Sequence, residues 1–296
     1  MAGYTAATNI AELIPEITLE VDYIYQNKSL GRMLATVAEV SAKPGITVEV
    51  PRFTEVTAST GVGETGAPAS HQMDLSMPTL TIARRSVYVG LGDLAKKGAT
   101  GDVASQIGVA MGMSMVKAID ASIFGIVTAT TDWTTATGAT DAAMSLGYIQ
   151  DGILLLEKNE VDDQLFGVLH PHQWDPIRAL FSPVFGATNA YQAGGIQISN
   201  VVSDEILKQG KGNFYGVDWF VNNRIGSGTV ASTGDCYNGL LFSKRGIGYA
   251  FSWLNESGIE AERSAVYALD HLVLNWADSA GVIYNSAVCK LYSTSG

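Results

Sequence analysis

The chain has 296 residues, of which 47% are hydrophobic and 16% are charged, and its formal net charge is −11. This apolar content is sufficient for a packed core in one large domain or two. The acidic balance argues against a protein whose main surface grips nucleic acid or an anionic membrane, but a container that encloses nucleic acid without binding it remains compatible.

The cysteines and the uncharged segments argue against a disulfide-rich, a secreted or a membrane-spanning protein. Cys236 and Cys289 are the only cysteines, too few for a disulfide framework, and we expect both to be buried small hydrophobes in a reducing compartment. The first basic residue is Lys28, so a secretory signal is not expected. The longest uncharged run, 179–203, contains Pro183 and several glycines and predicts a loop rather than a membrane span.

The first recognisable element is an amphipathic segment. Residues 8–34 alternate apolar and acidic side chains and are interrupted by Pro15. This pattern predicts an N-terminal arm that ends in a short helix.

Two segments of strict alternation follow, at 46–56 and 79–91. Together they predict a long β-hairpin, whose connection of about 22 residues is rich in Gly, Ala, Ser, Thr and Pro. Two strands alone are marginal in water, and so long an unstructured connection is uncommon inside a compact domain. We therefore expect support from outside the hairpin, most simply from a neighbouring subunit.

Asp102 is a suitable N-cap for a long helix that the apolar spacing predicts to about residue 128. Such a helix would be about 40 Å long at 1.5 Å per residue. Gly108, Gly112 and Gly125 lie within it, which lowers helix propensity but permits close backbone approach.

From about residue 142 the pattern becomes mixed α/β. We expect, in order, a helix at 145–159, a strand at 164–170, a helix opened by Asp175 and Pro176, a polar loop at 183–200, a helix at 202–209, strands at 212–223 and 238–246, and two tail strands at 258–276 and 280–292 joined through residues 278–281.

One stretch, GVGETG at 61–66, has the glycine spacing of a dinucleotide-binding loop. That loop works only where a strand leads into a helix whose N-terminus receives the phosphates. Here Pro68 and a polar run follow, and Arg84 and Arg85 stand near the position of the required acidic residue. The stretch is better interpreted as a flexible glycine-rich tip.

The sequence contains few patterns that are typical of a metal site or a catalytic site. His170 and His172 have no Cys or carboxylate at ligand spacing, and the carboxylates between 157 and 163 are typical of a solvated turn. No nucleophile elbow, zinc-protease motif or Walker loop is present. We therefore expect no enzyme activity, cofactor or metal. Arg84 and Arg85 would point to opposite faces of the hairpin's return strand, where they suit salt bridges to acidic partners.

The order of these parts, together with several local phrases, resembles the major capsid proteins of tailed bacteriophages, which have the Hong Kong 97-type fold. The phrases are IAELIPEI at 10–17, GVLHPHQWDPI at 167–177, GVDWFVNNRI at 216–225, NGLLFSKRGIGYAF at 238–251 and the tail from Gly258. The resemblance implies an α+β fold and self-assembly through hexamers and pentamers into an icosahedral shell that encloses double-stranded DNA.

The resemblance also implies a division of the chain. It gives an N-terminal arm at 1–40, an extended loop at 41–95, a peripheral domain with a spine helix at 96–141, an axial domain at 142–250, and tail strands at 251–296 that return to the peripheral domain. The implied partners are further copies of the chain, a separate scaffolding protein, a portal and decoration proteins. The implied location is the virion capsid, assembled in the host cytoplasm, with no membrane contact and no sequence-specific DNA binding.

Two departures from the family pattern matter. The type member cross-links its extended loop through a lysine, but no lysine lies between Lys43 and Lys96 here, so that chemistry is not expected. The chain also begins almost at the arm, whereas members with a built-in scaffold begin with a long charged extension. We therefore expect any scaffold to be a separate protein.

The residues expected at the subunit interface lie on the extended loop: Arg52, Phe53, Gly61, Gly63, Gly66, Pro68, Arg84 and Arg85. Three other hypotheses stay open from the sequence. They are an encapsulin-type compartment with a cargo enzyme, a nucleotide-dependent enzyme that uses the GVGETG loop, and an adhesive β protein.

Overall fold

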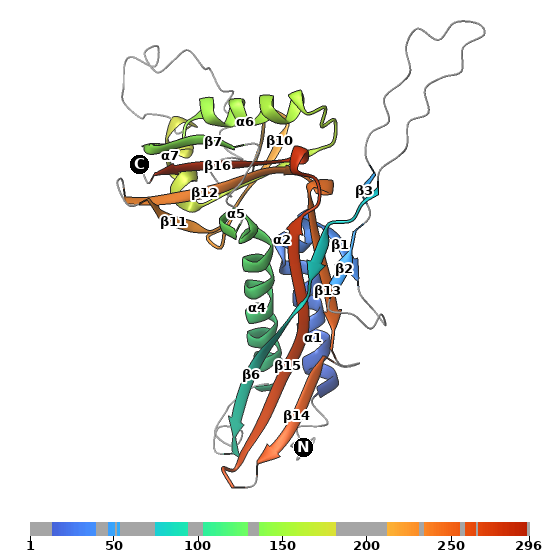
Figure 1. Cartoon of the computed structure of the whole chain (residues 1–296). Coiled ribbons are helices and arrows are strands. Elements are labelled where there is room, and N and C mark those ends of the chain that lie inside the picture. Colours follow the sequence, from blue (N-terminus) through green and yellow to red (C-terminus); the bar gives the residue numbers. More distant parts are fainter. Residues whose placement is uncertain are drawn as a thin grey trace, which may run out of the picture.

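The computed structural model describes residues 14–39, 47–50, 52–53, 75–93, 103–129, 136–181, 212–230, 234–254, 258–264 and 266–294. These residues form an elongated body built on a five-stranded sheet and a compact body built on a seven-stranded sheet. A narrow hairpin projects beside the junction of the two bodies (Figure 1).

The elongated body combines two long helices with its sheet. The strands run in the order β1-β13-β15-β14, and β6 also pairs with β15. Only β1 and β13 are parallel; the other pairs are antiparallel. Its elements are α1 (Ile14–Lys28), α2 (Leu30–Leu34), β1 (Thr36–Glu39), β6 (Ala83–Gly92), α4 (Val103–Phe124), β13 (Ile247–Trp253), β14 (Ile259–Ser264) and β15 (Leu269–Val282).

Glycines bring α1 against α4, as the sequence suggested. A Cβ placed on Gly108 would lie 3.0 Å from Cβ of Glu20, and one on Gly112 would lie 3.1 Å from Cβ of Ile24. The two helices therefore approach more closely than larger residues would allow. Pro15 lies in the first turn of α1, where its missing N–H costs nothing, so it starts this helix rather than breaking it.

The predicted long helix is present with one interruption. α4 ends at Phe124, Gly125 forms a turn, and α5 (Ile126–Ala129) continues toward the compact body. The Gly125 N–H still donates to the carbonyl of Ala121 at 2.9 Å, so the chain bends without losing that bond. The expected cap, Asp102, lies outside the described residues.

The compact body has strand order β7-β16-β12-β8-β10-β9, and β11 also pairs with β12. The helices α6 and α7 belong to this body (Figure 1). Its elements are β7 (Ala136–Ala143), α6 (Leu146–Lys158), β8 (Leu165–Leu169), α7 (Pro171–Phe181), β9 (Gly212–Phe214), β10 (Val217–Val221), β11 (Ser227–Val230), β12 (Gly234–Ser243) and β16 (Val288–Thr294).

Two sequence expectations were wrong in this part of the chain, and others fall outside the described residues. α7 begins at Pro171, with Pro176 inside it, rather than at Pro176. The expected strand at 212–223 is a hairpin, because Tyr215 and Gly216 both adopt positive φ between β9 and β10, which is the conformation of a two-residue hairpin turn. The expected loop at 183–200 and the helix at 202–209 fall outside the described residues.

The tail also differs from expectation. The segment 258–276 is not one strand but the hairpin of β14 and β15, and residues 278–281 continue β15 instead of ending it. The last strand, β16, pairs with β12 and β7 in the compact body. The tail at 251–296 therefore contributes strands to both bodies, and its return to a peripheral domain stays a prediction.

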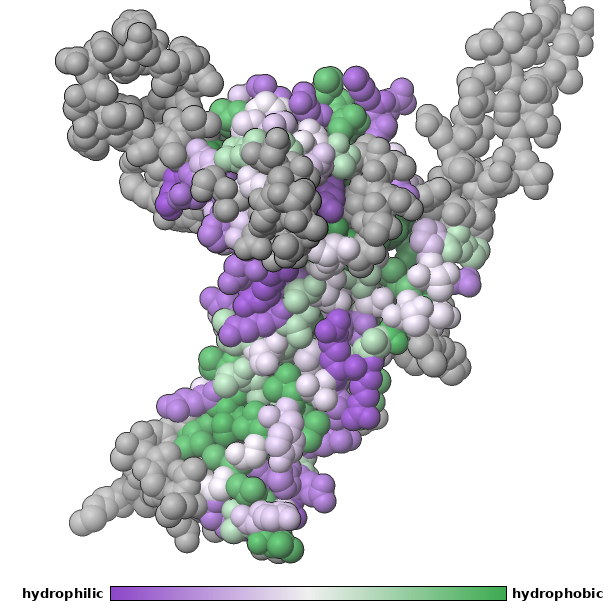
Figure 2. Space-filling model, turned by 60° about the vertical axis from the view of Figure 1, so that its left-hand side comes forward, coloured by the Kyte–Doolittle hydropathy of each residue, from purple (hydrophilic) through white to green (hydrophobic). Residues whose placement is uncertain are grey.

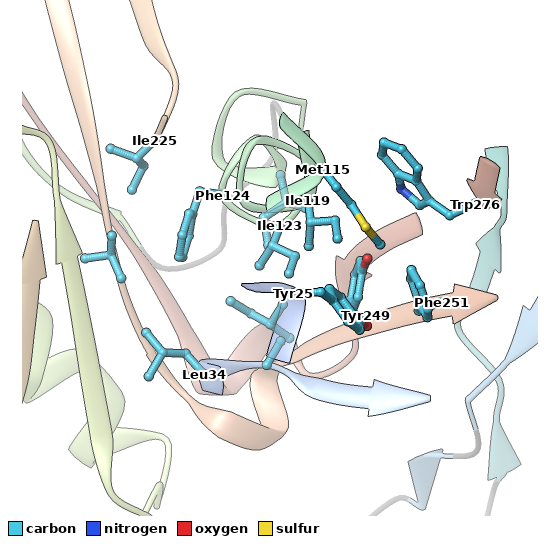
Figure 3. Packing of buried hydrophobic residues seen from close by; sticks show 14 of the residues in the cluster. Tyr25, Leu34, Met115, Ile119, Ile123, Phe124, Ile225, Tyr249, Phe251 and Trp276 are labelled. Carbon is cyan, nitrogen blue, oxygen red and sulfur yellow. The ribbon is translucent and has the colours of Figure 1, made fainter. Parts of the chain in front are cut away.

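The main core lies between the helices and the sheet of the elongated body and continues into the compact body (Figure 3). Tyr25 stacks on Phe251 with ring centroids 4.8 Å apart. Phe124 and Ile225 belong to the same cluster as Met115 and Trp276, so apolar packing is continuous across the junction. Cys236 and Cys289 are buried free thiols, as expected.

A buried carboxylate joins three segments at this junction. Asp120 of α4 accepts hydrogen bonds from the Ser29 hydroxyl (3.0 Å) and the Gly31 N–H (2.9 Å), and from the Asn222 side chain (3.4 Å) after β10. Burial raises the pKa of Asp120, while its hydrogen bonds oppose that shift. The contacts of this one side chain therefore connect both bodies.

Candidate subunit interface

The projecting hairpin is the first part of the candidate site. β2 (Thr47–Glu49) pairs with β5 (Thr79–Thr81), and farther out β3 (Arg52–Phe53) pairs with β4 (Leu75–Ser76). The Val50 N–H donates to the Pro78 carbonyl at 3.0 Å, which links the two ladders. The described part of the hairpin is therefore one continuous antiparallel ribbon that leads away from the body (Figure 1).

Leu80 fixes the base of this hairpin on the sheet. Its side chain is buried and lies over Gly248 and Gly281, which are direct partners on β13 and β15. A Cβ on Gly281 would lie 2.6 Å from Leu80 Cδ2, and one on Gly248 would lie 3.5 Å from Leu80 Cδ1. The paired glycines thus form a notch that only the absence of side chains leaves open.

The return strand of the hairpin divides at Ile82, and this corrects the sequence expectation. Within the expected return strand at 79–91, residues 79–81 pair with the outgoing strand, while β6 at 83–92 leaves the hairpin and pairs with β15. Alternation continues through both parts, so the sequence contains no signal for the change of partner. As a consequence, the hairpin is a direct extension of a strand in the main sheet.

Arg84 and Arg85 lie where the hairpin meets the sheet. The Arg84 guanidinium donates to Oδ1 of Asn275 at 3.0 Å. On the other face, Arg85 forms an ion pair with Asp278 at 2.6 Å and donates to the Ser122 hydroxyl at 3.2 Å. The two guanidiniums do use opposite faces, but the acidic partner of Arg85 is in the same chain.

Asp278 is a buried charge, with a side chain of 0% exposure, whereas Arg85 remains 39% exposed. Trp276 Nε1 also donates to Asp278 Oδ1 at 3.1 Å. Burial raises the pKa of Asp278, and the charge of Arg85 opposes this shift. Arg85 thus ties the root of the hairpin to the buried face of the sheet.

The other predicted interface residues fall into two groups. Arg52 and Phe53 lie on β3, paired with Ser76 and Leu75 respectively. Gly61, Gly63, Gly66 and Pro68 lie outside the described residues. Contact of any of these residues with a neighbouring subunit stays a prediction.

Sequence reasoning missed an apolar tip at the far end of the elongated body. Val266 and Tyr267, in the turn between β14 and β15, are 87% and 73% exposed. The signal that could have revealed this turn is length, since a continuous strand over 258–276 would exceed the usual maximum of about ten residues.

A cluster of ion pairs lies next to the apolar tip formed by Val266 and Tyr267. Arg263 of β14 donates two hydrogen bonds of 2.6 Å to the carboxylate of Asp93 and one of 3.2 Å to Asp270 of β15. The Asp93 N–H also donates to the Ala268 carbonyl at 3.1 Å. Paired bonds from a guanidinium fix geometry as well as charge, so the apolar tip is presented on a rigid support.

The helices of the elongated body carry further exposed apolar side chains. They are Leu19 and Tyr23 on α1 and Val109 and Met113 on α4. Hydrophobic residues gather on the lower part of the elongated body when this side comes forward (Figure 2). The segment 105–128 is long and apolar enough to cross a membrane, but half of it is buried inside the protein, which is the behaviour of a core helix.

The described part of the chain gives little support for a metal site or a catalytic site. No group of three or more His, Cys, Asp or Glu side chains able to hold a metal lies together among the described residues. His170 and His172 stack on each other and on Tyr237. The features that stand out are those of protein–protein contact: a projecting hairpin with an anchored base, and exposed apolar side chains on firm supports.

Comparison with known proteins agrees with this interpretation. The model of the phage capsid protein family matches residues 76–267, from the hairpin to the apolar tip. Comparison with curated proteins gave no match.

Several solved structures share the fold over nearly the whole chain. The capsid of Ralstonia phage GP4 aligns with a TM-score of 0.64 at 10% identity, covering 89% of this chain and 90% of that one. The mature capsid of bacteriophage PhiM1 gives 0.61 at 12% identity, with 90% and 87% covered. A virus-like particle from Pyrococcus furiosus gives 0.53 at 11% identity, with 95% and 98% covered.

At these identities the solved structures establish an α+β capsid fold, while the family model covers well over half of the sequence. The chain therefore belongs to the phage capsid protein family and is a major capsid protein of the virion shell.

Proposed function

We propose that this capsid protein self-assembles through hexamers and pentamers into an icosahedral shell around double-stranded DNA. The observation that carries the proposal is the hairpin, whose base is fixed by Leu80 in the Gly248–Gly281 notch and whose strands extend off the body. Beyond this anchored base the ribbon should need another surface, since two strands alone are marginal in water.

We further propose that the fold is of the Hong Kong 97 type. In this assignment the hairpin, within the expected span 41–95, is the extended loop and α4 is the spine helix. The elongated body is the peripheral domain. The compact body is the axial domain, enlarged beyond 142–250 because β7 and β16 pair within its sheet.

The proposed contacts between subunits follow from the same geometry. Arg52, Phe53, Gly61, Gly63, Gly66 and Pro68 would lie on a neighbouring subunit, with Arg84 and Arg85 at the root of the loop. The tip at Val266 and Tyr267 would contact a copy at the far end of the elongated body, because exposed apolar side chains on a rigid turn favour association. Many modest contacts of this kind can sum to a stable shell.

The remaining partners are proposed from the resemblance and the charge. The net charge of −11 suits a wall that encloses a polyanion without gripping it, so no sequence-specific DNA contact is proposed. A separate scaffolding protein, a portal and decoration proteins are the proposed partners, with assembly in the host bacterial cytoplasm. No catalytic role and no loop cross-link are proposed.

The test begins with expression of the chain alone, followed by size-exclusion chromatography and negative-stain microscopy. We expect capsomers, sheets or hollow shells, whereas a stable monomer at high concentration would contradict the proposal. Deletion of residues 57–72 should leave β3 and β4 intact and the subunit folded, but it should abolish closed particles.

A matched pair of variants tests the base of the hairpin. Gly281→Val would displace Leu80, because even a Cβ at that position lies 2.6 Å from it, and should lower the particle yield of a folded subunit. Gly90→Val is the control, since a Cβ there meets only the Tyr88 hydroxyl at 3.6 Å. Equal yields from both variants would argue against a role for the notch in assembly.

The contents of particles from an infected host distinguish the remaining alternatives. Double-stranded DNA protected from nuclease is expected for the proposed function. A shell filled with a protein cargo instead would favour the encapsulin-type alternative, and saturable dinucleotide binding lost in Gly63→Val would favour the enzyme.

A further inference from the structure

The first turn of α7 is capped by a histidine. α7 begins at Pro171, so His170 occupies the N-cap position, and its Nδ1 accepts a hydrogen bond from the His172 N–H at 3.3 Å. In return, the Gln173 side chain accepts one from the His170 N–H at 3.4 Å. This reciprocal arrangement resembles a capping box, except that an imidazole replaces the usual hydroxyl and its donor is the N2 rather than the N3 amide.

The cap belongs to a cluster of three rings. His170 and His172 lie nearly parallel with centroids 5.3 Å apart, and each lies 4.5 Å from the ring of Tyr237 on β12. Both imidazoles are in the first turn, where the helix dipole disfavours positive charge. Protonation of both would also place two like charges next to each other.

Neighbouring groups do not compensate a charge on His170. The titratable groups that contact its ring are His172 on its own element and Tyr237 on β12. Farther along α7, Asp175 and Arg178 pair with each other at 2.8 Å. Within the described parts of the chain, no hydrogen bond, ion pair or ring contact joins His170 to a carboxylate.

Among the side chains that the structure describes, the sheet beneath α7 adds no charge on this side. Asp235 shares the strand face of Tyr237 by register, but its side chain is outside the described part. Strand alternation puts Cys236 and Lys290 on the face opposite to that of Tyr237 and Leu291. The group that connects α7 to the sheet is neutral: Gln173 is fully buried, and its Nε2 donates to the Tyr237 carbonyl at 2.9 Å and to the Ser293 hydroxyl at 3.2 Å.

We propose that His170 is a pH-sensitive cap, which holds the first turn of α7 on β12 while its Nδ1 is unprotonated and releases that turn when Nδ1 gains a proton. Release follows because protonation removes the acceptor of the His172 N–H and adds a charge at the helix start. The proposal concerns the folded subunit and stands independently of shell assembly.

The direction of the pH response follows from linkage. Burial, with a smaller contribution from His172, lowers the pKa of His170 from its usual 6.5. The unfolded or released state therefore binds the proton more readily, so the stability that the cap contributes is complete above pH 6.5 and is lost as the pH falls through the lowered pKa. Acidification is the signal to which this helix start responds.

Amide hydrogen exchange measured by mass spectrometry tests the proposal on the full chain. Peptides that cover 168–181 are compared between pH 7.5 and 5.0 after correction for the intrinsic exchange rate. We expect protection of the first turn to fall about tenfold on acidification, the factor that corresponds to the loss of one helix cap. A wild-type chain without this change would overturn the proposal.

Three variants separate the cap from general acid effects. His170→Asn supplies a cap that does not titrate, so protection should stay high at both pH values. His170→Ala should lower protection at both. His271→Gln, which changes a histidine on β15, should keep the wild-type response. Retention of that response in His170→Asn would overturn the proposal.

Discussion

The two bodies of the subunit are stabilised by different kinds of buried polar groups. Among the side chains whose burial is described, the buried carboxylates are Asp120, Asp270 and Asp278, all in the elongated body. The buried polar side chains of the compact body are neutral: Gln173, Asn222, Asn238, Ser243 and Ser293. Two glycine contacts also differ between the bodies: Gly112 of α4 faces the aliphatic side chain of Ile24, whereas Gly167 of β8 faces the ring of Trp219.

Buried groups in the two bodies respond to acid in opposite directions. Burial raises the pKa of Asp120 and Asp278 above the usual 3.8, so the folded chain binds these protons more readily than the unfolded chain. Their contribution to stability therefore increases as the pH falls through the raised pKa. The contribution of His170 in the compact body decreases over its own range, below pH 6.5. Within one subunit, proton binding therefore favours folding at Asp120 and Asp278 and opposes it at His170.

The largest expected effect comes from removing the partner of a buried charge in the elongated body. Arg85→Met leaves Asp278 buried without its ion pair and should cost about 3 kcal/mol of unfolding free energy, the low end for such pairs because Arg85 is partly exposed. Arg84→Met is the matched control, since its partner Asn275 is neutral, and should cost about 1 kcal/mol. Urea unfolding of the unassembled subunit measures the loss of unfolding free energy in both variants. Equal losses would contradict the distinction between charged and neutral contacts.

The packing contrast predicts the next largest effect. Gly167→Ala would place a Cβ 2.3 Å from the ring of Trp219, which is 1% exposed, and should cost about 2 kcal/mol through overpacking. Gly112→Ala makes a tight contact with Cβ of Ile24, but at the longer distance of 3.1 Å, and a gain of up to about 1 kcal/mol of helix propensity offsets its cost. The second variant should therefore be near neutral in the same unfolding measurement, and a reversed order would contradict the packing argument.

Asp120→Asn tests the sign of the proton linkage in the elongated body. The amide oxygen can still accept from Ser29 and Gly31, while the buried charge and the weak acceptor of the Asn222 amide, at 3.4 Å, are removed. Stability at pH 7 should change by less than about 1 kcal/mol, and the increase in stability expected from this group on acidification should disappear. Unfolding at pH 7 and pH 5 checks this, and an unchanged pH dependence would show that Asp120 does not carry the linkage.

The smallest effect on folding is expected at the apolar tip. Val266→Ser combined with Tyr267→Ser changes side chains that are mostly exposed, so unfolding free energy should change by less than about 0.5 kcal/mol. Assembly should nevertheless weaken, which light scattering of the purified subunit can follow. Unimpaired assembly would remove the tip from the list of proposed contacts.

Local periodicity predicted much of the secondary structure, because it depends on residues close in sequence. The helix from Val103, the helix α6 and the strand β8 follow their apolar spacing, and the close approach at Gly108 and Gly112 was also expected. The fold class came from the order of weak motifs, which resembles a known family, rather than from any single element.

The remaining features depend on contacts between distant segments. The change of partner at Ile82 and the notch at Gly248 and Gly281 require the register of β13, β15 and β5, which alternation alone does not specify. The turn after Ser264 contains no Gly, Pro or Asn, so it lacks the usual turn signal. The start of α7 was misplaced because Pro171 and Pro176 are both compatible with a helix start.

The contact between Leu80 and the paired glycines is also a point about which the hairpin can tilt. Val48 is paired with Leu80, and Phe53 lies five residues farther along the ribbon, about 16 Å away at ~3.3 Å per residue. A tilt of about 10° at the leucine would therefore displace Phe53 by about 3 Å over that length. If the hairpin contacts a neighbouring subunit as proposed, a slight repacking of Leu80 against the two glycines would shift its contact point by this amount.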